Sequence, residues 1–99
     1  MRYEYSARFR IGAGDVSEIA RRLAAHSYAV LAPRERSRIR LLFPTSAPST
    51  TPEDAVVALD DDRAFVTIHR GHRAEREKVL VLLTSIFHSL GQMTHFEDD

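Results

Sequence analysis

Arginine is the residue type in this chain that offers the most specific chemistry, since it provides thirteen of the fourteen Lys and Arg side chains. A guanidinium group can hold a carboxylate or a phosphate through two parallel hydrogen bonds. Four arginines lie at alternate positions in two segments with the period of a β-strand, and they are Arg8, Arg10, Arg38 and Arg40. If those strands are neighbours, the four side chains gather on one face of a sheet. We predict that this surface contacts an acidic partner protein.

Acidic residues are concentrated in the second half of the chain. Residues 1–49 hold nine arginines and four acidic residues, a net charge of +5, whereas residues 50–99 hold five basic and ten acidic residues, a net charge of −5. Two compact acidic groups occur there, and they consist of Asp60, Asp61 and Asp62, and of Glu97, Asp98 and Asp99. We expect both groups to contact a basic patch of the same partner and to steer its approach.

Residue types that carry out catalysis or hold metals do not occur in a recognisable arrangement. The chain has no cysteine, which excludes disulfides and zinc sites built from thiolates. His69 and His72 flank a short turn but lack a third ligand at a metal-binding spacing. Ser85, His88 and Ser89 lie on one helical segment, where their side chains do not converge on a pocket. We therefore expect no catalytic residues, no metal ion and no cofactor.

Two segments have the apolar period of an α-helix. In the first, residues 15–26, we expect Asp15 to cap the helix and Glu18 to pair with Arg22 one turn later. The second runs from about residue 73 to residue 90 and has one broad apolar face. Val81 falls outside that face, so we expect its side chain to be exposed. Because this face is wider than one contact requires, a homodimer is a further hypothesis.

Strand-like patterns occupy most of the remaining chain. They cover residues 3–11, 28–32, 39–43, 56–59, 64–69 and 93–96. Residues 52–59 also fit a short helix, because Pro52 is followed by two acidic residues that suit a first helical turn. We favour a hairpin, because residues 65–68 are strongly strand-like and need a neighbouring strand.

The order of these elements predicts the fold class. It runs strand, helix, four strands, helix, strand. Two helices cannot cover both faces of a mainly antiparallel sheet of five to six strands, so we predict an α+β two-layer sandwich with both helices on one face. The chain length predicts a single domain over residues 1–99, with a flexible Pro/Ser/Thr-rich loop at 44–52 and an acidic tail at 97–99.

The two periods together predict the core. The residues expected to be buried are Tyr5, Phe9, Ile11, Ile19, Leu23, Ile39, Leu41, Val66, Ile68, Val79, Leu83 and Ile86.

These features favour a non-enzymatic protein-binding module. A stoichiometric inhibitor, of the type of bacterial immunity proteins and antitoxins that block a partner protein, needs only such a charged surface. The alternative is a binder of nucleic acid or of a phosphate ligand on the Arg-rich open face of the sheet. We prefer the first, because the chain is neutral overall and the arginine-bearing faces of its two strands have no stacking aromatic residues. No apolar run is long enough for a signal peptide or a membrane span, so we expect a cytoplasmic protein without membrane contact.

Overall fold

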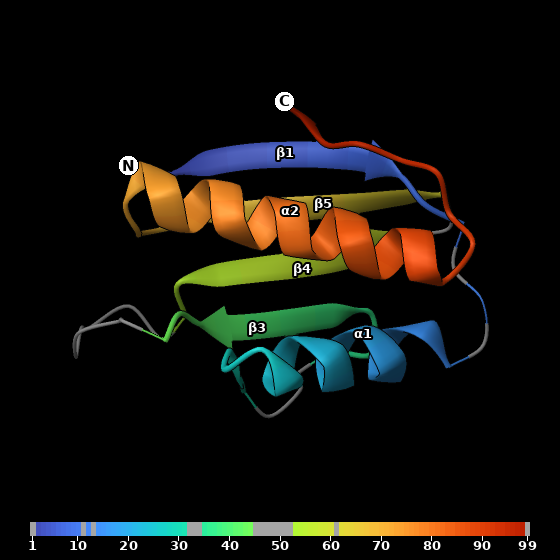
Figure 1. Ribbon diagram of the computed structural model, residues 1–99, viewed down its shortest axis with the longest axis horizontal. Coiled ribbons are helices and arrows are strands. Elements are labelled where there is room, and N and C mark those ends of the chain that lie inside the picture. The colour runs from blue at the N-terminus through green and yellow to red at the C-terminus, as the bar shows by residue number, and fades with distance from the viewer. Residues whose placement is uncertain are drawn as a thin grey trace.

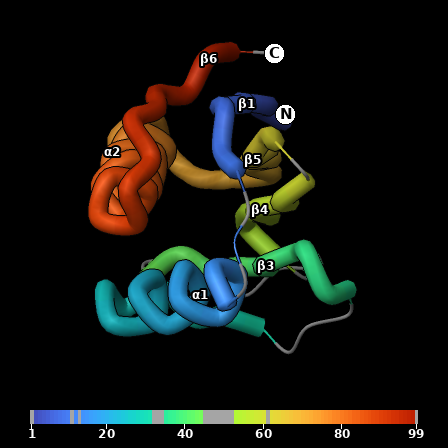
Figure 2. The backbone as a smooth tube through the Cα atoms, turned by 90° about the vertical axis from the view of Figure 1, so that its right-hand side faces the viewer, coloured from blue at the N-terminus to red at the C-terminus, as the bar shows by residue number. Residues whose placement is uncertain are grey.

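The structure is a computed structural model that describes residues 2–10, 12, 14–31, 35–44, 53–60 and 62–98. Its elements are, in chain order, β1 (Tyr3–Arg8), α1 (Asp15–Ala25), β2 (Ala29–Val30), β3 (Arg38–Leu42), β4 (Ala55–Asp60), β5 (Arg63–Ile68), α2 (Arg73–Ser89) and β6 (Glu97–Asp98). The strands form one antiparallel sheet in the order β2-β3-β4-β5-β1-β6. Figures 1 and 2 show α1 and α2 on the same side of this sheet. The predicted α+β class and the predicted order of elements are confirmed.

The β4–β5 hairpin forms the centre of the sheet. Val57 lies opposite Val66 in the middle of the hairpin, and both side chains are fully buried beneath the helices. Residues 55–60 are therefore a strand, as the hairpin interpretation predicted. The predicted flexible loop at 44–52 lies, apart from Pro44, outside the described residues.

The C-terminal strand forms later in the chain than the pattern indicated. Residues 93–96 are irregular, and β6 instead consists of Glu97 and Asp98. These two residues lie opposite Ser6 and Tyr5 of β1, so they belong to the sheet and do not extend as a free tail. Acidic side chains on such a short edge strand discourage pairing with another chain.

The core lies between the two helices and the sheet. Ten of the twelve residues predicted for it are buried, Tyr5 is half-buried, and Ile11 is outside the described residues. Phe87 of α2, which the prediction left out, is fully buried, and its ring centroid lies 4.3 Å from that of Phe9 and 5.7 Å from that of Phe96. Phe87 therefore packs against both Phe9, which follows β1, and Phe96, which precedes β6.

Helix α1 begins differently from its predicted start. Gly14 is the capping residue and has a left-handed backbone, with φ of 82°. Asp15 is the first helical residue, and its carboxylate accepts a hydrogen bond from the Gly12 N–H at 2.7 Å. The prediction of Asp15 as the cap is thus wrong, because glycine adopts the left-handed conformation without the steric cost of a side chain. The acidic group still lies in the first turn, where the helix dipole favours it.

The Phe43 side chain, which follows β3, packs closely against Gly71, which lies between β5 and α2. A Cβ atom on this residue would lie 2.6 Å from a ring carbon of Phe43, and the backbone φ of 128° also favours glycine. The Phe43 ring makes an edge contact with Tyr28, at 6.0 Å between centroids. Burial raises the pKa of Tyr28, and the Glu75 carboxylate raises it further.

A buried carboxylate connects three strands at this end of the sheet. Asp54 is 1% exposed, and one of its oxygens accepts the Phe43 N–H at 2.7 Å, at the end of β3. Its other oxygen lies 2.8 Å from Nε of Arg70, which follows β5. Its backbone donates to Leu41 and accepts from His69. Because a buried charge is tolerated only when it is paired and hydrogen-bonded, these contacts fix where β4 begins relative to its neighbours.

Replacing Leu83 with Ala tests the placement of α2. Leu83 is fully buried, so its loss leaves a cavity, and the free energy of unfolding should fall by about 2–5 kcal/mol. Val81 on the same helix is 70% exposed, as predicted. V81A should therefore change the free energy of unfolding by less than about 0.5 kcal/mol. Urea unfolding measures both. Equal values for the two variants would show that α2 packs through another face.

Replacing Asp54 with Ala tests the buried carboxylate. The variant leaves the Phe43 N–H and the Arg70 guanidinium without this acceptor, so the free energy of unfolding should fall by about 3 kcal/mol. D60A, which removes an exposed carboxylate from the other end of β4, is the matched control and should have little effect. Two variants of equal stability would contradict the structural role of Asp54.

Candidate binding face of the sheet

The side of the sheet opposite the helices carries no helix from the described part of the chain (Figure 2). Strand alternation and register place the following side chains on it: Glu4, Ser6 and Arg8 of β1, Arg38, Arg40 and Leu42 of β3, Val56, Ala58 and Asp60 of β4, and Arg63, Phe65 and Thr67 of β5. We call this set the open face. At its centre Ala58 lies opposite Phe65 and Val56 lies opposite Thr67, and all four are partly exposed. The centre of the open face is therefore mostly apolar.

The predicted cluster of four arginines does not form as one group. It required β1 and β3 to be neighbours, but β4 and β5 lie between them. Three steps between strands of about 4.8 Å separate Arg8 from Arg38 and Arg40 by about 14 Å across the sheet. The arginines are kept apart because the β4–β5 hairpin pairs as a unit, with β4 against β3 and β5 against β1. The arginines therefore lie on opposite sides of the apolar centre.

The two arginines of β3 differ in their exposure. Nε of Arg38 lies 3.1 Å from the Glu35 carboxylate, and more than half of each side chain is exposed. Arg40 lies 3.9 Å from Glu53, and their side chains are only 15% and 17% exposed. Arg38 is thus available to a partner, since exposed ion pairs are weak and easily exchanged. Arg40 mainly supports the packing of β3 against the start of β4.

On the other side of the apolar centre, Arg8 lies directly opposite Arg63. The Arg63 guanidinium donates a hydrogen bond of 2.9 Å to Oγ of Ser6, whose residue is 2% exposed. Neither arginine forms an ion pair with a described residue. Sequence reasoning missed Arg63, although its spacing of two from Phe65 already indicated a shared face. Arg10 is exposed beyond the end of β1, where its backbone exchanges hydrogen bonds with the Gln92 amide.

The two predicted acidic groups lie near this pair of arginines. Asp60 is opposite Arg63 in the hairpin, and the backbone oxygen of Asp62 accepts the Phe9 N–H at 3.0 Å. Glu97 and Asp98 lie in β6 beside β1. Asp61 and Asp99 are outside the described residues. The structure thus places Asp60 beside Arg63, on the strand next to β3, and places Glu97 and Asp98 beside β1.

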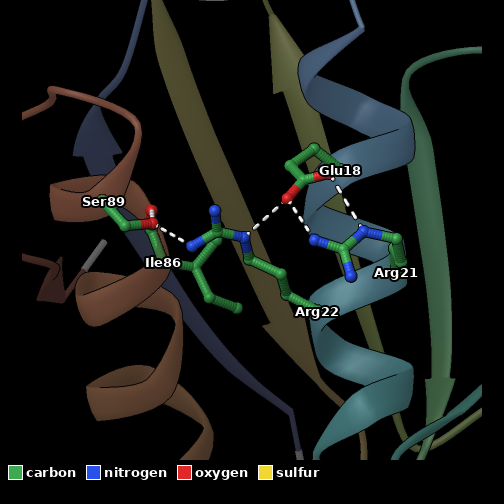
Figure 3. A network of polar contacts seen from close by, with 5 residues as sticks. All are labelled: Glu18, Arg21, Arg22, Ile86 and Ser89. Carbon is green, nitrogen blue, oxygen red and sulfur yellow. Dashed lines mark hydrogen bonds and ion pairs between the residues drawn. The ribbon is translucent and has the colours of Figure 1, made fainter.

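Three charged side chains of α1 form a network of contacts within the chain. Figure 3 shows Glu18 accepting hydrogen bonds from Arg21 at 2.6 Å and, as predicted, from Arg22 at 2.8 Å. These bonds lower the pKa of Glu18 to about 2 and raise that of Arg21. Arg22 also donates to the Ser89 hydroxyl, which itself donates to the backbone oxygen of Ile86 at 2.6 Å. This network links α1 to the end of α2 and commits Ser89 to a structural contact.

Neither a metal site nor a membrane span is found in the described part of the chain. No three His, Asp or Glu side chains among the described residues are arranged to hold a metal ion. None of the helices formed by those residues combines the length and the apolar character needed to cross a bilayer. No protein-family model matches the chain, and no curated protein sequence or solved structure is significantly similar to it. The open face is therefore the feature of the molecule that bears on its function.

The low pKa of Glu18 makes its contribution to stability dependent on pH. A lowered pKa in the folded state stabilises the protein above the unfolded value, here 4.5, and that contribution is lost as the pH falls through the folded value of about 2. Wild type should therefore melt at a higher temperature than E18Q at neutral pH, and the difference should shrink between these two pH values. Thermal melts followed by circular dichroism measure it. A difference that stays constant down to the lower value would contradict the ion-pair network.

Proposed function

We propose that this chain is a non-enzymatic protein-binding module whose open face contacts an acidic surface of a partner protein. The observation that carries the proposal is a partly exposed apolar centre, around Phe65 and Val56, on the side of the sheet that the two helices leave uncovered. Arginines lie on both sides of that centre. Aromatic residues and arginine surrounded by a polar rim are the composition that distinguishes protein interfaces from the remaining surface.

Charge complementarity gives the chemistry of the partner. Arg8 and Arg63 lie side by side without an ion pair to a described residue, and the exposed Arg38 can exchange Glu35 for a carboxylate of the partner. Phe65 supplies the apolar contact between them. A partner that presents carboxylates around an apolar patch meets all of these groups at once. Asp60, opposite Arg63, and Glu97, in β6 beside β1, then face a basic patch on the same partner.

The mode of action that fits such a face is stoichiometric blocking. An inhibitor of the type of immunity proteins and antitoxins acts by covering a surface of its partner, and this requires a rigid face without catalytic groups. An antiparallel sheet with a core of buried residues behind it provides that rigidity. We place this function in the cytoplasm, where a cysteine-free chain needs no oxidative folding.

A second candidate function is binding of single-stranded nucleic acid. Phe65 at the centre of the open face, with Arg63 two residues earlier on the same strand, provides one stacking surface beside a cation. This observation corrects the expectation that the arginine-bearing face lacks aromatic residues, which considered only the strands now known as β1 and β3. Protein binding remains the preferred function, because the chain has no net positive charge and Phe65 is the only aromatic residue among those of the open face.

Capture followed by direct titration tests the proposed function. Wild-type chain, F65A and R38E are used to capture proteins from a lysate of the native host, and each captured protein is purified and titrated by calorimetry. Loss of the aromatic anchor or of the cation should weaken binding by about tenfold or more. K78E, which reverses an exposed charge on α2, is the matched control and should bind like wild type.

Circular dichroism confirms that each variant is folded. Equal affinities for wild type, F65A and R38E would contradict the proposal. Binding of a single-stranded oligonucleotide that F65A abolishes, without a captured protein, would favour the second candidate.

A further inference from the structure

A small hollow of about 210 Å³ lies where the open face meets the segment that leads into β6. Its polar lining consists of Ser6, Arg8, Arg63, Thr94, His95 and Glu97. Figure 1 shows this C-terminal segment passing along β1 after the end of α2. The hollow therefore has walls from two strands and from a segment that is distant from both in the sequence.

Two like charges form one wall of this hollow. Arg8 and Arg63 occupy directly opposite positions on adjacent strands, an arrangement that is unfavourable unless an anion neutralises it. The hydrogen bond from Arg63 to the buried Ser6 holds its guanidinium in place instead of letting it turn toward Asp60. The Arg63 side chain therefore loses its conformational entropy when the protein folds, before any ligand binds.

The size and charge of the hollow select among anions. A hollow of this volume is smaller than the pockets of about 300–1,000 Å³ that hold whole cofactors or nucleotides. The lining contains one carboxylate besides the two arginines, that of Glu97, which lies 3.3 Å from His95. The two arginines and Glu97 together give the lining a net charge of +1, which matches a single negative charge. A phosphate dianion would exceed this charge, and Glu97 would repel it more strongly than a carboxylate with a single charge.

We propose that Arg8 and Arg63 form a carboxylate-binding pocket that receives an Asp or Glu side chain of the partner protein. This inference rests on the proposed function and identifies one contact within it. Met93, which also lines the hollow, is 87% exposed. Its side chain supplies an apolar contact for the carbon chain that carries the carboxylate. The pocket thus fixes the position of one acidic residue beside the apolar centre of the open face.

Titration with acetate tests the pocket without the partner. In ¹⁵N-labelled protein, acetate should shift the amide signals of Thr94 and Arg63 in a saturable way, and inorganic phosphate should bind more weakly. R8Q and R63Q should each weaken acetate binding by about tenfold, because each removes charge-assisted hydrogen bonds. R10Q removes a nearby exposed arginine that does not line the hollow, and it should bind acetate like wild type.

Each outcome separates this inference from the proposed function. If acetate causes no saturable shift, if R10Q weakens binding as much as R63Q, or if phosphate binds more tightly than acetate, the carboxylate pocket is wrong while the open face can still capture its partner. If acetate binds as predicted but F65A and R38E leave capture unchanged, the partner protein as the source of the carboxylate is wrong, and the proposed function fails with it.

Discussion

The sheet has six strands but only two helices to cover it, and the structure depends on this constraint. The helices cover one face of the sheet, so each strand must alternate between residues that face the core and residues that do not. Val57 and Val66 are fully buried beneath the helices, whereas Val56 and Phe65 next to them are partly exposed on the other side. An apolar centre on an uncovered face costs free energy unless another surface covers it. The fold itself therefore creates the candidate binding site.

Polar contacts at the ends of the strands keep the strands of this face in register. Asp54 joins the ends of β3 and β5 to the start of β4 at one end of the sheet. At the other end the Asp62 backbone holds the chain at Phe9 as it leaves β1. The arginines of the open face thus lie on strands whose relative positions are fixed at both ends. A preformed face of this kind loses little conformational entropy when it binds.

Local sequence patterns predicted the class of the fold, but they did not predict which distant strands pair with one another. Alternation correctly gave the face of Arg8 and of Arg38, and the acidic turn correctly indicated the β4–β5 hairpin. Strand order is a property of distant segments, so nothing near β1 showed that its partner is β5. Asp54 was missed because an acidic residue two positions after Pro52 resembles the first turn of a helix, and its buried partners come from other strands.

Methyl cross-saturation from a bound partner tests the central claim most directly. The chain is labelled at the methyl groups of Val and Ala, and saturation is transferred from the unlabelled captured protein. The signals of Val56 and Ala58 on the open face should lose intensity, while that of Val81, exposed on α2, should not. Loss of intensity at Val81 with unchanged signals at Val56 and Ala58 would show that the partner binds the helices, and would contradict a binding function for the open face.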